Sequence, residues 1–200
     1  MTIKFLLPLI AVTVISSGYA LVEARQPKQT LTPAKPEASE AAQSQWKLFT
    51  APDGRFTVLM PGTPTTVNQT QKTFMGEINL QLVIGQPPKQ EVAYVVAYND
   101  FPDSYGQMAD PQEVLSNAQA MALKTTQSNL LTQRDIRSSN GHPGKEIEYL
   151  NPGGKVTRNR MYFAEGRLYQ VMVITTKKQQ KTLAATMTGF LNSFNVVLKK

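Results

Sequence analysis

Hydrophobic and polar residues divide the chain into three regions with different patterns. An apolar run from Phe5 to Ile15 is followed by a polar, proline-containing stretch at residues 21–44, and then by alternating patterns over residues 45–200. Alternation with a period of two is typical of half-buried strands, and a spacing of three or four residues is typical of amphipathic helices. We therefore expect one folded domain, which covers residues 45–200.

Strand patterns dominate this third region. Residues 77–84 alternate apolar and polar side chains, which predicts a strand with one buried face. Residues 92–98 are apolar throughout and predict a central strand that is covered on both faces. Apolar runs between turn residues predict further strands at residues 46–50, 55–60, 65–74, 145–150, 155–164, 167–175 and 194–198.

Two segments predict amphipathic helices. The first begins at Asp110, which Pro111 follows at the first helical position and Glu113 at capping-box spacing, and it extends to about Leu130. The second covers about residues 179–192 and has an apolar side. Two such helices and a largely antiparallel sheet predict an α+β fold of the α/β/α sandwich type, and an open sheet with both helices on one face is the alternative.

The N-terminal pattern is typical of a secretory signal peptide at residues 1–20. Lys4 precedes the apolar run, and small residues precede a cleavage point after Ala20, with a cut after Ala24 as the alternative. The run is shorter than the ~20 residues that span a bilayer, so an uncleaved anchor is the less favoured interpretation. Residues 21–44 bury little apolar surface and predict a disordered linker. The sequence therefore predicts an exported protein.

Charge and cysteine content limit the candidate chemistry. Residues 45–200 hold 17 Lys and Arg side chains against 11 Asp and Glu, a net charge of +6, which favours acidic partners or anionic lipid headgroups. The chain has no cysteine, which excludes thiol nucleophiles, thiolate metal sites and lipidation of an N-terminal cysteine. Its basic residues are dispersed and do not interleave with aromatic residues, so we expect no nucleic-acid binding.

The sequence lacks a recognisable catalytic or metal-binding constellation. His142 is the only histidine, and it lies in a loop between Gly141 and Pro143. The sequence has no Gly-x-Ser-x-Gly pattern, and zinc would lack both a cysteine and a second histidine. We therefore expect a protein that is not an enzyme, with no catalytic residue, no metal and no cofactor.

Two surface features are candidate contacts for a protein partner or a membrane-associated complex. The first is the loop at residues 99–109, whose three neighbouring carboxylates lack the spacing of an EF-hand and are better explained as loop residues and a helix cap. The second is a basic cluster near residue 180, for which a solvated face is the alternative. The candidate contact residues are Asp100, Phe101, Tyr105, Lys177, Lys178 and Lys181.

Charged residues also alternate in the predicted hairpin over residues 145–164. In the register that its short turn implies, Glu148 lies opposite Arg158 and Glu146 lies opposite Arg160. We favour this structural pairing. The alternative is a site in which Arg158, Arg160 and Tyr162 bind a small hydrophobic or anionic ligand, with a weak hydrolase activity.

Four segments carry a family resemblance. Residues 46–64, the stretch from Tyr94 to Pro102, the turn from Gly141 to Gly144 and the closing residues 189–194 resemble secreted cyanobacterial proteins of the PsbP-like α/β/α fold. The resemblance covers residues 46–198. PsbP proteins are extrinsic subunits or assembly factors of photosystem II in the thylakoid lumen, so the resemblance implies a non-enzymatic accessory protein of the periplasm or the thylakoid lumen. The chain departs from the family by lacking a cysteine for a lipid anchor, and no functional residue of the family is carried over.

Overall fold

The computed structural model of the chain describes residues 45–73, 76–88, 90–102, 106 and 108–198. The predicted signal peptide and linker, residues 1–44, lie outside the described residues and remain predictions.

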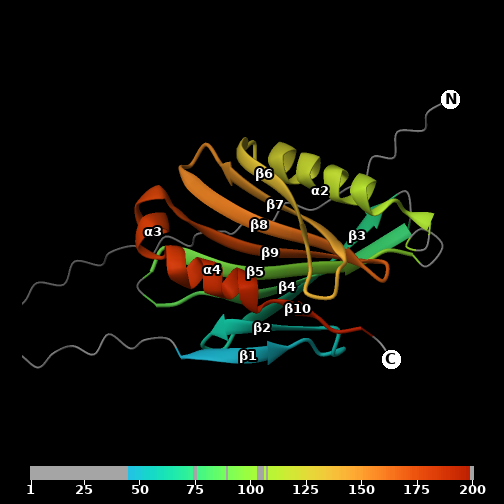
Figure 1. Cartoon of the computed structure of the whole chain (residues 1–200), viewed down its shortest axis with the longest axis horizontal. Helices are drawn as coiled ribbons and strands as arrows, with labels where there is room; N and C mark the ends of the chain where they lie inside the picture. Colours follow the sequence, from blue (N-terminus) through green and yellow to red (C-terminus); the bar gives the residue numbers. More distant parts are fainter. Residues whose placement is uncertain (1–44, 74–75, 89, 103–105, 107, 199–200) are drawn as a thin grey trace, which may run out of the picture. The chain divides into compact units, whose positions relative to one another are not determined.

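A seven-stranded antiparallel sheet forms the centre of the fold (Figure 1). Its strand order is β3-β4-β5-β9-β8-β7-β6, so strands β6 to β9 form a meander. The strands are β3 (Thr65–Thr73), β4 (Gly76–Gly85), β5 (Val92–Asp100), β6 (Asn129–Arg137), β7 (Pro143–Leu150), β8 (Lys155–Ala164) and β9 (Arg167–Thr176).

The middle strands show the burial that their patterns predict. Every residue of β5 except Asp100 is buried, which confirms a central strand covered on both faces. In β4, Leu80 and Leu82 are buried whereas Glu77 and Asn79 are exposed, as the alternation predicts.

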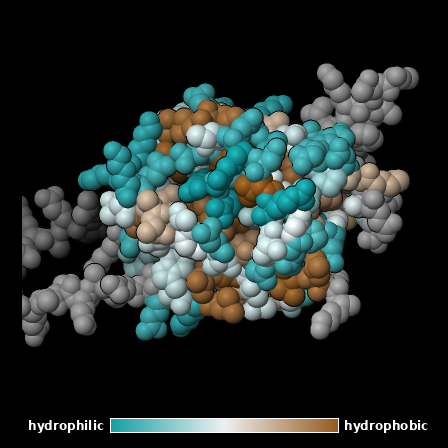
Figure 2. Space-filling view, in the orientation of Figure 1, coloured by the Kyte–Doolittle hydropathy of each residue, from teal (hydrophilic) through white to brown (hydrophobic). Residues whose placement is uncertain are grey.

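A second, three-stranded sheet consists of β1 (Trp46–Thr50), β2 (Phe56–Pro61) and β10 (Asn195–Val196). Strand β10 pairs with β2, so the last strand of the chain returns to the first hairpin. On the face shown in Figure 2, hydrophilic side chains separate the apolar areas from one another. In the three-stranded sheet, Leu48 of β1 and Leu59 of β2 lie directly opposite each other, and both side chains are exposed.

Helices cover both faces of the large sheet. On one face, α2 (Pro111–Thr125) buries Val114, Leu115 and Ala118 against a cluster that includes Met161 of β8. On the other face, α4 (Ala184–Ser193) and the small sheet pack against a cluster that includes Tyr162. Because Met161 and Tyr162 are consecutive in β8, these clusters lie on opposite faces. The predicted α/β/α sandwich is confirmed, and the alternative with both helices on one face is wrong.

Two helix boundaries differ from the prediction. The first helix starts as predicted, with Asp110 Oδ1 accepting from the Gln112 amide at 2.9 Å, but it ends at Thr125. Gln127 has a φ of 50°, which is incompatible with continuing the helix, and residues 129–137 form β6. The predicted second helix is two helices, α3 (Lys177–Thr182) and α4, which meet at Leu183.

Every helix in the described part of the chain is too short or too polar to span a bilayer.

Candidate binding site

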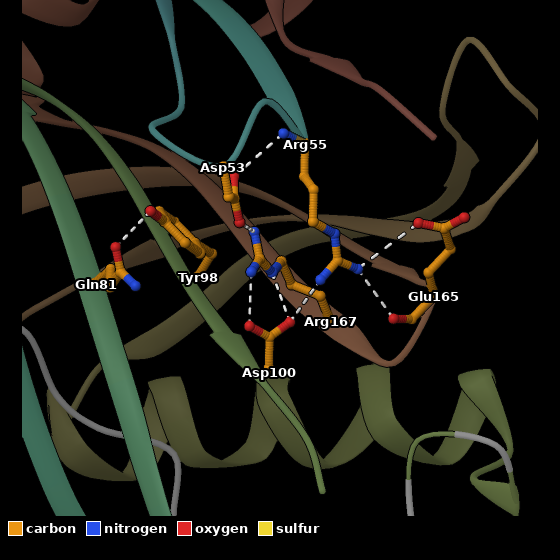
Figure 3. A network of polar contacts seen from close by, with 7 residues as sticks. All are labelled: Asp53, Arg55, Gln81, Tyr98, Asp100, Glu165 and Arg167. Atoms are coloured by element: carbon orange, nitrogen blue, oxygen red, sulfur yellow. Dashed lines mark hydrogen bonds and ion pairs between the residues drawn. The ribbon is translucent and has the colours of Figure 1, made fainter. Parts of the chain in front are cut away.

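A first polar network lies where the β1–β2 turn and the β8–β9 turn meet the end of β5 (Figure 3). Arg167 donates from Nε and Nη2 to the two carboxylate oxygens of Asp100 at 2.7 and 2.6 Å, and from Nη1 to Asp53 Oδ2 at 2.6 Å. Its guanidinium carbon lies 4.7 Å from the ring centroid of Tyr98, and its side chain is 4% exposed. A buried guanidinium requires partners for its charge and its donors, and these carboxylates supply them.

Arg55 belongs to the same network. It donates from Nη1 to Asp100 Oδ1 at 2.8 Å and from Nη2 to the main-chain oxygen of Glu165 at 3.0 Å. Its own main-chain amide donates to Asp53 Oδ1 at 3.1 Å. The network therefore joins three segments that are far apart in the sequence.

The protonation states of this network favour a structural role. Burial alone would raise the pKa of Asp100, but hydrogen bonds and charges from Arg167 and Arg55 lower it below its ordinary value. For Asp53, burial is likewise outweighed by the Arg55 amide and the Arg167 guanidinium, so its pKa is also lowered. Both carboxylates are ionised at neutral pH and are poor general acids.

Asp53, Arg55 and Arg167 are absent from the sequence-based site predictions, although the sequence holds a signal for them. Asp53-Gly54-Arg55 and Glu165-Gly166-Arg167 repeat the order acid, glycine, arginine at two turns. Gly54 and Gly166 have φ values of 72° and 70°, which glycine adopts readily. The repeat marks two turns that each present an arginine to the same carboxylate, Asp100.

A second polar network, on β6, β7 and β8, places three arginines around one carboxylate. Nε and Nη2 of Arg134 lie 3.0 and 2.9 Å from Glu146 Oε1, and Arg158 Nη2 donates to the same oxygen at 3.0 Å. Arg160 Nε donates to Glu146 Oε2, and its Nη1 donates to Asn192 Oδ1 of α4 at 2.8 Å. Glu146 therefore accepts from all three guanidinium groups.

The backbone register confirms the predicted hairpin, and the side-chain contacts refine it. Glu146 pairs with Arg160 and Glu148 pairs with Arg158 in the β7–β8 register. Arg158, however, reaches diagonally to Glu146. Glu148 instead accepts from Gln180 Nε2 of α3 at 3.0 Å. The hairpin is thus bound to α3 as well as paired within itself.

The two networks differ in their charge balance. Arg55 and Arg167 face three carboxylates, whereas within the described ranges Arg134, Arg158 and Arg160 form ion pairs with Glu146 alone. Burial alone would raise the pKa of Glu146, but hydrogen bonds from Arg160 and Arg158 lower it, so this carboxylate is ionised. Two positive charges remain in excess, and the Arg134 side chain is 59% exposed. Exposed guanidinium groups of this kind bind carboxylates and other oxyanions.

Helix α3 extends the positive charge of this second network. Its three lysines are exposed, and the bond between Gln180 and Glu148 holds α3 beside the hairpin. We call this surface the basic face, and its six cations outnumber its two carboxylates by four. Its members are Arg134, Arg158, Arg160, Lys177, Lys178, Lys181, Glu146 and Glu148.

The predicted contact residues Asp100 and Phe101 have partners within the fold, although the Asp100 side chain is 53% exposed. The carboxylate of Asp100 is held by Arg167 and Arg55. Phe101 is 5% exposed and packs on Phe163, with 5.7 Å between ring centroids, so it is not an accessible contact residue. Tyr105 lies outside the described residues.

Tyr162 and His142 also have structural surroundings. Tyr162 is 5% exposed and stacks on Phe194 with 5.7 Å between ring centroids, so its ring belongs to the core beside α4. The main-chain amide of His142 donates to Ser138 Oγ at 3.0 Å, so this serine hydroxyl contacts the backbone of the loop. Among the described residues, no group of three His, Asp or Glu side chains is placed to hold a metal ion.

The fold is similar to that of cyanobacterial PsbP. The solution structure of CyanoP from Synechocystis sp. PCC 6803 matches with a TM-score of 0.54 and 12% sequence identity, over 80% of this chain and 97% of that chain. This match supports the PsbP-like fold that the sequence resemblance implies. A Pseudomonas aeruginosa protein of unknown function, PA94, described as a putative regulator, matches with a TM-score of 0.40 and 11% identity, over 78% of this chain and 98% of that chain. No protein-family model and no curated protein matches the sequence.

Proposed function

We propose that this protein is an exported, non-enzymatic accessory protein that docks on an acidic surface of a membrane-associated protein complex. The observation that carries the proposal is the shared use of Glu146 by Arg134, Arg158 and Arg160, which leaves positive charge in excess on the basic face. Complementary charge of this kind steers association and selects the partner.

The leader pattern and the fold support the compartment in this proposal. The pattern of residues 1–20 is that of a cleavable signal. If the leader were instead retained, residues 21–44 would be a tether that lets the domain at residues 45–200 reach a partner from the membrane. The PsbP-like fold makes the lumenal side of photosystem II, in the thylakoid membrane, the first candidate complex. A complex that faces the periplasm is the second.

The state of the acidic groups supports a role in binding rather than catalysis. Asp53, Asp100 and Glu146 are each held by arginines that lower the pKa of the carboxyl group. A general acid at neutral pH needs the opposite shift. These groups are suited to fixing the geometry of a rigid docking surface.

Affinity capture tests the proposal. The full chain, tagged at its C-terminus and expressed in its source organism, is captured from gently solubilised membranes at low salt and at about 0.5 M NaCl. We expect a defined set of proteins at low salt and their loss at high salt. Recovery of free monomer alone under both conditions would contradict docking.

A charge-matched pair of variants separates the basic face from net charge. The triple variant Arg134→Gln, Lys177→Gln, Lys178→Gln removes three exposed cations of the basic face. The control variant Lys47→Gln, Lys124→Gln, Arg137→Gln removes three exposed cations outside the basic face. We expect the first variant to lose the captured proteins and the second to retain them. Equal losses would assign the binding to overall charge.

A further inference from the structure

Charged residues alternate in sign across three neighbouring strands and stop at an edge of the sheet. Arg160 of β8 lies directly opposite Glu146 of β7, and Glu146 lies directly opposite Arg134 of β6. Among the residues that the structure describes, β6 is the last strand of the seven-stranded sheet, so Arg134 has a cross-strand partner on one side only. Its side chain is 59% exposed. A strand added at this edge would place a residue beside Arg134, and a carboxylate there would complement the positive charge.

The opposite face of the same strand shows the reverse charge. Lys145 of β7 lies opposite Asp135 of β6, with 4.0 Å between Nζ and Oδ1. The Asp135 side chain is 75% exposed and also ends its row at the edge. Because neighbouring residues of a strand point to opposite faces, a strand beside β6 would meet Arg134 with one residue and Asp135 with the next.

The outer edge of β6 has the geometry that an added strand requires. Natural edge strands are protected from pairing by bulges and prolines, as well as by charges. In β6 the bulge is confined to the region between Leu130 and Thr132, the register is regular from Thr132 to Arg137, and the strand has no proline. All but one of its residues are exposed. Its regular half is thus open to backbone pairing.

We propose that the edge of β6 binds an extended segment of a partner protein as an additional strand, with an acidic residue beside Arg134 and a basic residue beside Asp135. Backbone hydrogen bonds along the edge provide affinity, and the two charged positions select the partner sequence. This inference rests on the proposed docking function and names the feature of the partner that would be recognised.

A second copy of β6 does not meet this requirement. Residues directly opposite each other in adjacent strands lie on the same face, so a two-fold symmetric pair joins positions that differ by an even number. Arg134 would then lie opposite Thr132, Ile136 or another Arg134, and never opposite Asp135. The charge pattern therefore favours a different chain.

Selection from a displayed library of random nine-residue peptides tests the inference on the purified protein. We expect enrichment of peptides that carry an acidic residue directly next to a basic one. An enriched peptide is then synthesised, and its affinity is measured by isothermal titration calorimetry. Selected peptides without this dipeptide would overturn the inference.

A variant of Arg134 and a charge-matched variant outside β6 provide the control. Arg134→Gln should weaken the peptide about two- to fivefold, the range expected for one cross-strand pair. Lys47→Gln removes the same charge from an exposed side chain of β1, outside the proposed binding edge, and it should leave the affinity unchanged. Equal losses in both variants would show attraction to overall charge and overturn the inference.

Backbone pairing has its own measurement. Hydrogen exchange of the amides at residues 132–137 should slow when the peptide binds. N-methylation of every second peptide residue should abolish binding when the methylated amides are those that face β6. Methylation of the other alternating set should leave binding intact. Protection confined to α3 would overturn the inference. Protection of β6 without peptide that disappears when residues 21–44 are deleted would identify the chain's own linker as the occupant and would also overturn it.

The outcomes distinguish this inference from the proposed function. Capture of a complex through the basic face without selection of such peptides would leave docking intact and reject the strand site. Selection of the expected peptides without capture of any complex would support the strand site and reject docking on a membrane-associated complex.

Discussion

Arg167 and Asp100 are direct cross-strand partners in β9 and β5, and two hydrogen bonds of 2.7 and 2.6 Å join their side chains. Arg167 is the first residue of β9 and Asp100 is the last residue of β5. The pair therefore fixes the turn before β9 against the end of β5. Asp53, from the β1–β2 turn, completes the set of partners of Arg167.

Replacement of Arg167 should destabilise the protein strongly. Arg167→Gln leaves Asp100 and Asp53 close together without their shared cation, and we expect the free energy of unfolding to fall by about 3 kcal/mol. Urea denaturation followed by circular dichroism measures this change. Arg137→Gln, at an exposed position, should change the free energy by less than about 0.5 kcal/mol. A similar small change in both variants would show that the network contributes little.

Acid should destabilise the protein through the same carboxylates. The pKa values of Asp53 and Asp100 are lowered in the folded state, so the unfolded chain binds protons first as the pH falls. The free energy of unfolding should be steady above about pH 5 and should decrease as the pH falls below about 4, through the folded pKa values. In Arg167→Gln the decrease should be shallower, with Glu146 contributing most of what remains. The same slope in both proteins, from urea denaturation between about pH 3 and pH 7, would reject this assignment.

Glu146 should contribute more to stability than Glu148, although both face arginines in the hairpin. Glu146→Gln removes the carboxylate that three guanidinium groups share, and we expect a loss of about 2 to 3 kcal/mol because Arg160 is largely buried. Glu148→Gln removes one hydrogen bond from Gln180 and should cost less than about 1 kcal/mol. Thermal unfolding of the two variants compares them directly. A larger effect at Glu148 would contradict the observed contacts.

Local patterns were sufficient for the elements whose burial is uniform or strictly alternating. The apolar run of β5 predicts a strand covered on both faces, and the structure buries it on both faces. The β7–β8 register is predictable because the turn at Pro152-Gly153-Gly154 determines which residues face each other. In both cases the information lies within one strand or one hairpin.

Strand β6 was not predictable because it lacks a periodic apolar pattern. Its apolar residues follow neither the period of two of a half-buried strand nor the period of 3.6 of an amphipathic helix. In the structure, all but one of its residues are exposed. The strand forms because β7 supplies backbone partners along most of its length. A contact with another segment thus overrides the weak local preference.

The first polar network, around Asp100, depends on still longer separations. Arg55 and Asp100 are 45 residues apart, and Asp100 and Arg167 are 67 residues apart. A local pattern contains no information on such a contact, and only the repeated order of acid, glycine and arginine indicated that the two turns are related. The burial of Phe101, which the sequence predicts as a contact residue, escaped prediction for the same reason. Its ring partner Phe163 comes from a distant strand.

Two glycines should respond in opposite directions to replacement by alanine. A Cβ at Gly144 would lie 2.6 Å from the main-chain oxygen of Met161 and 2.6 Å from the ring of Tyr162, so β7 and β8 would have to separate. We expect Gly144→Ala to destabilise the protein by about 1 to 3 kcal/mol, the usual cost of overpacking.

Gly189 lies at an exposed position within α4, and a Cβ there would meet nothing within 4 Å. Gly189→Ala should therefore stabilise the protein by about 0.5 to 1 kcal/mol, because alanine loses less backbone entropy in a helix. Urea denaturation of the two variants and the parent measures both changes. A stabilised Gly144→Ala protein would show that β7 and β8 approach less closely at Gly144, and a destabilised Gly189→Ala protein would show that the outer side of α4 is covered.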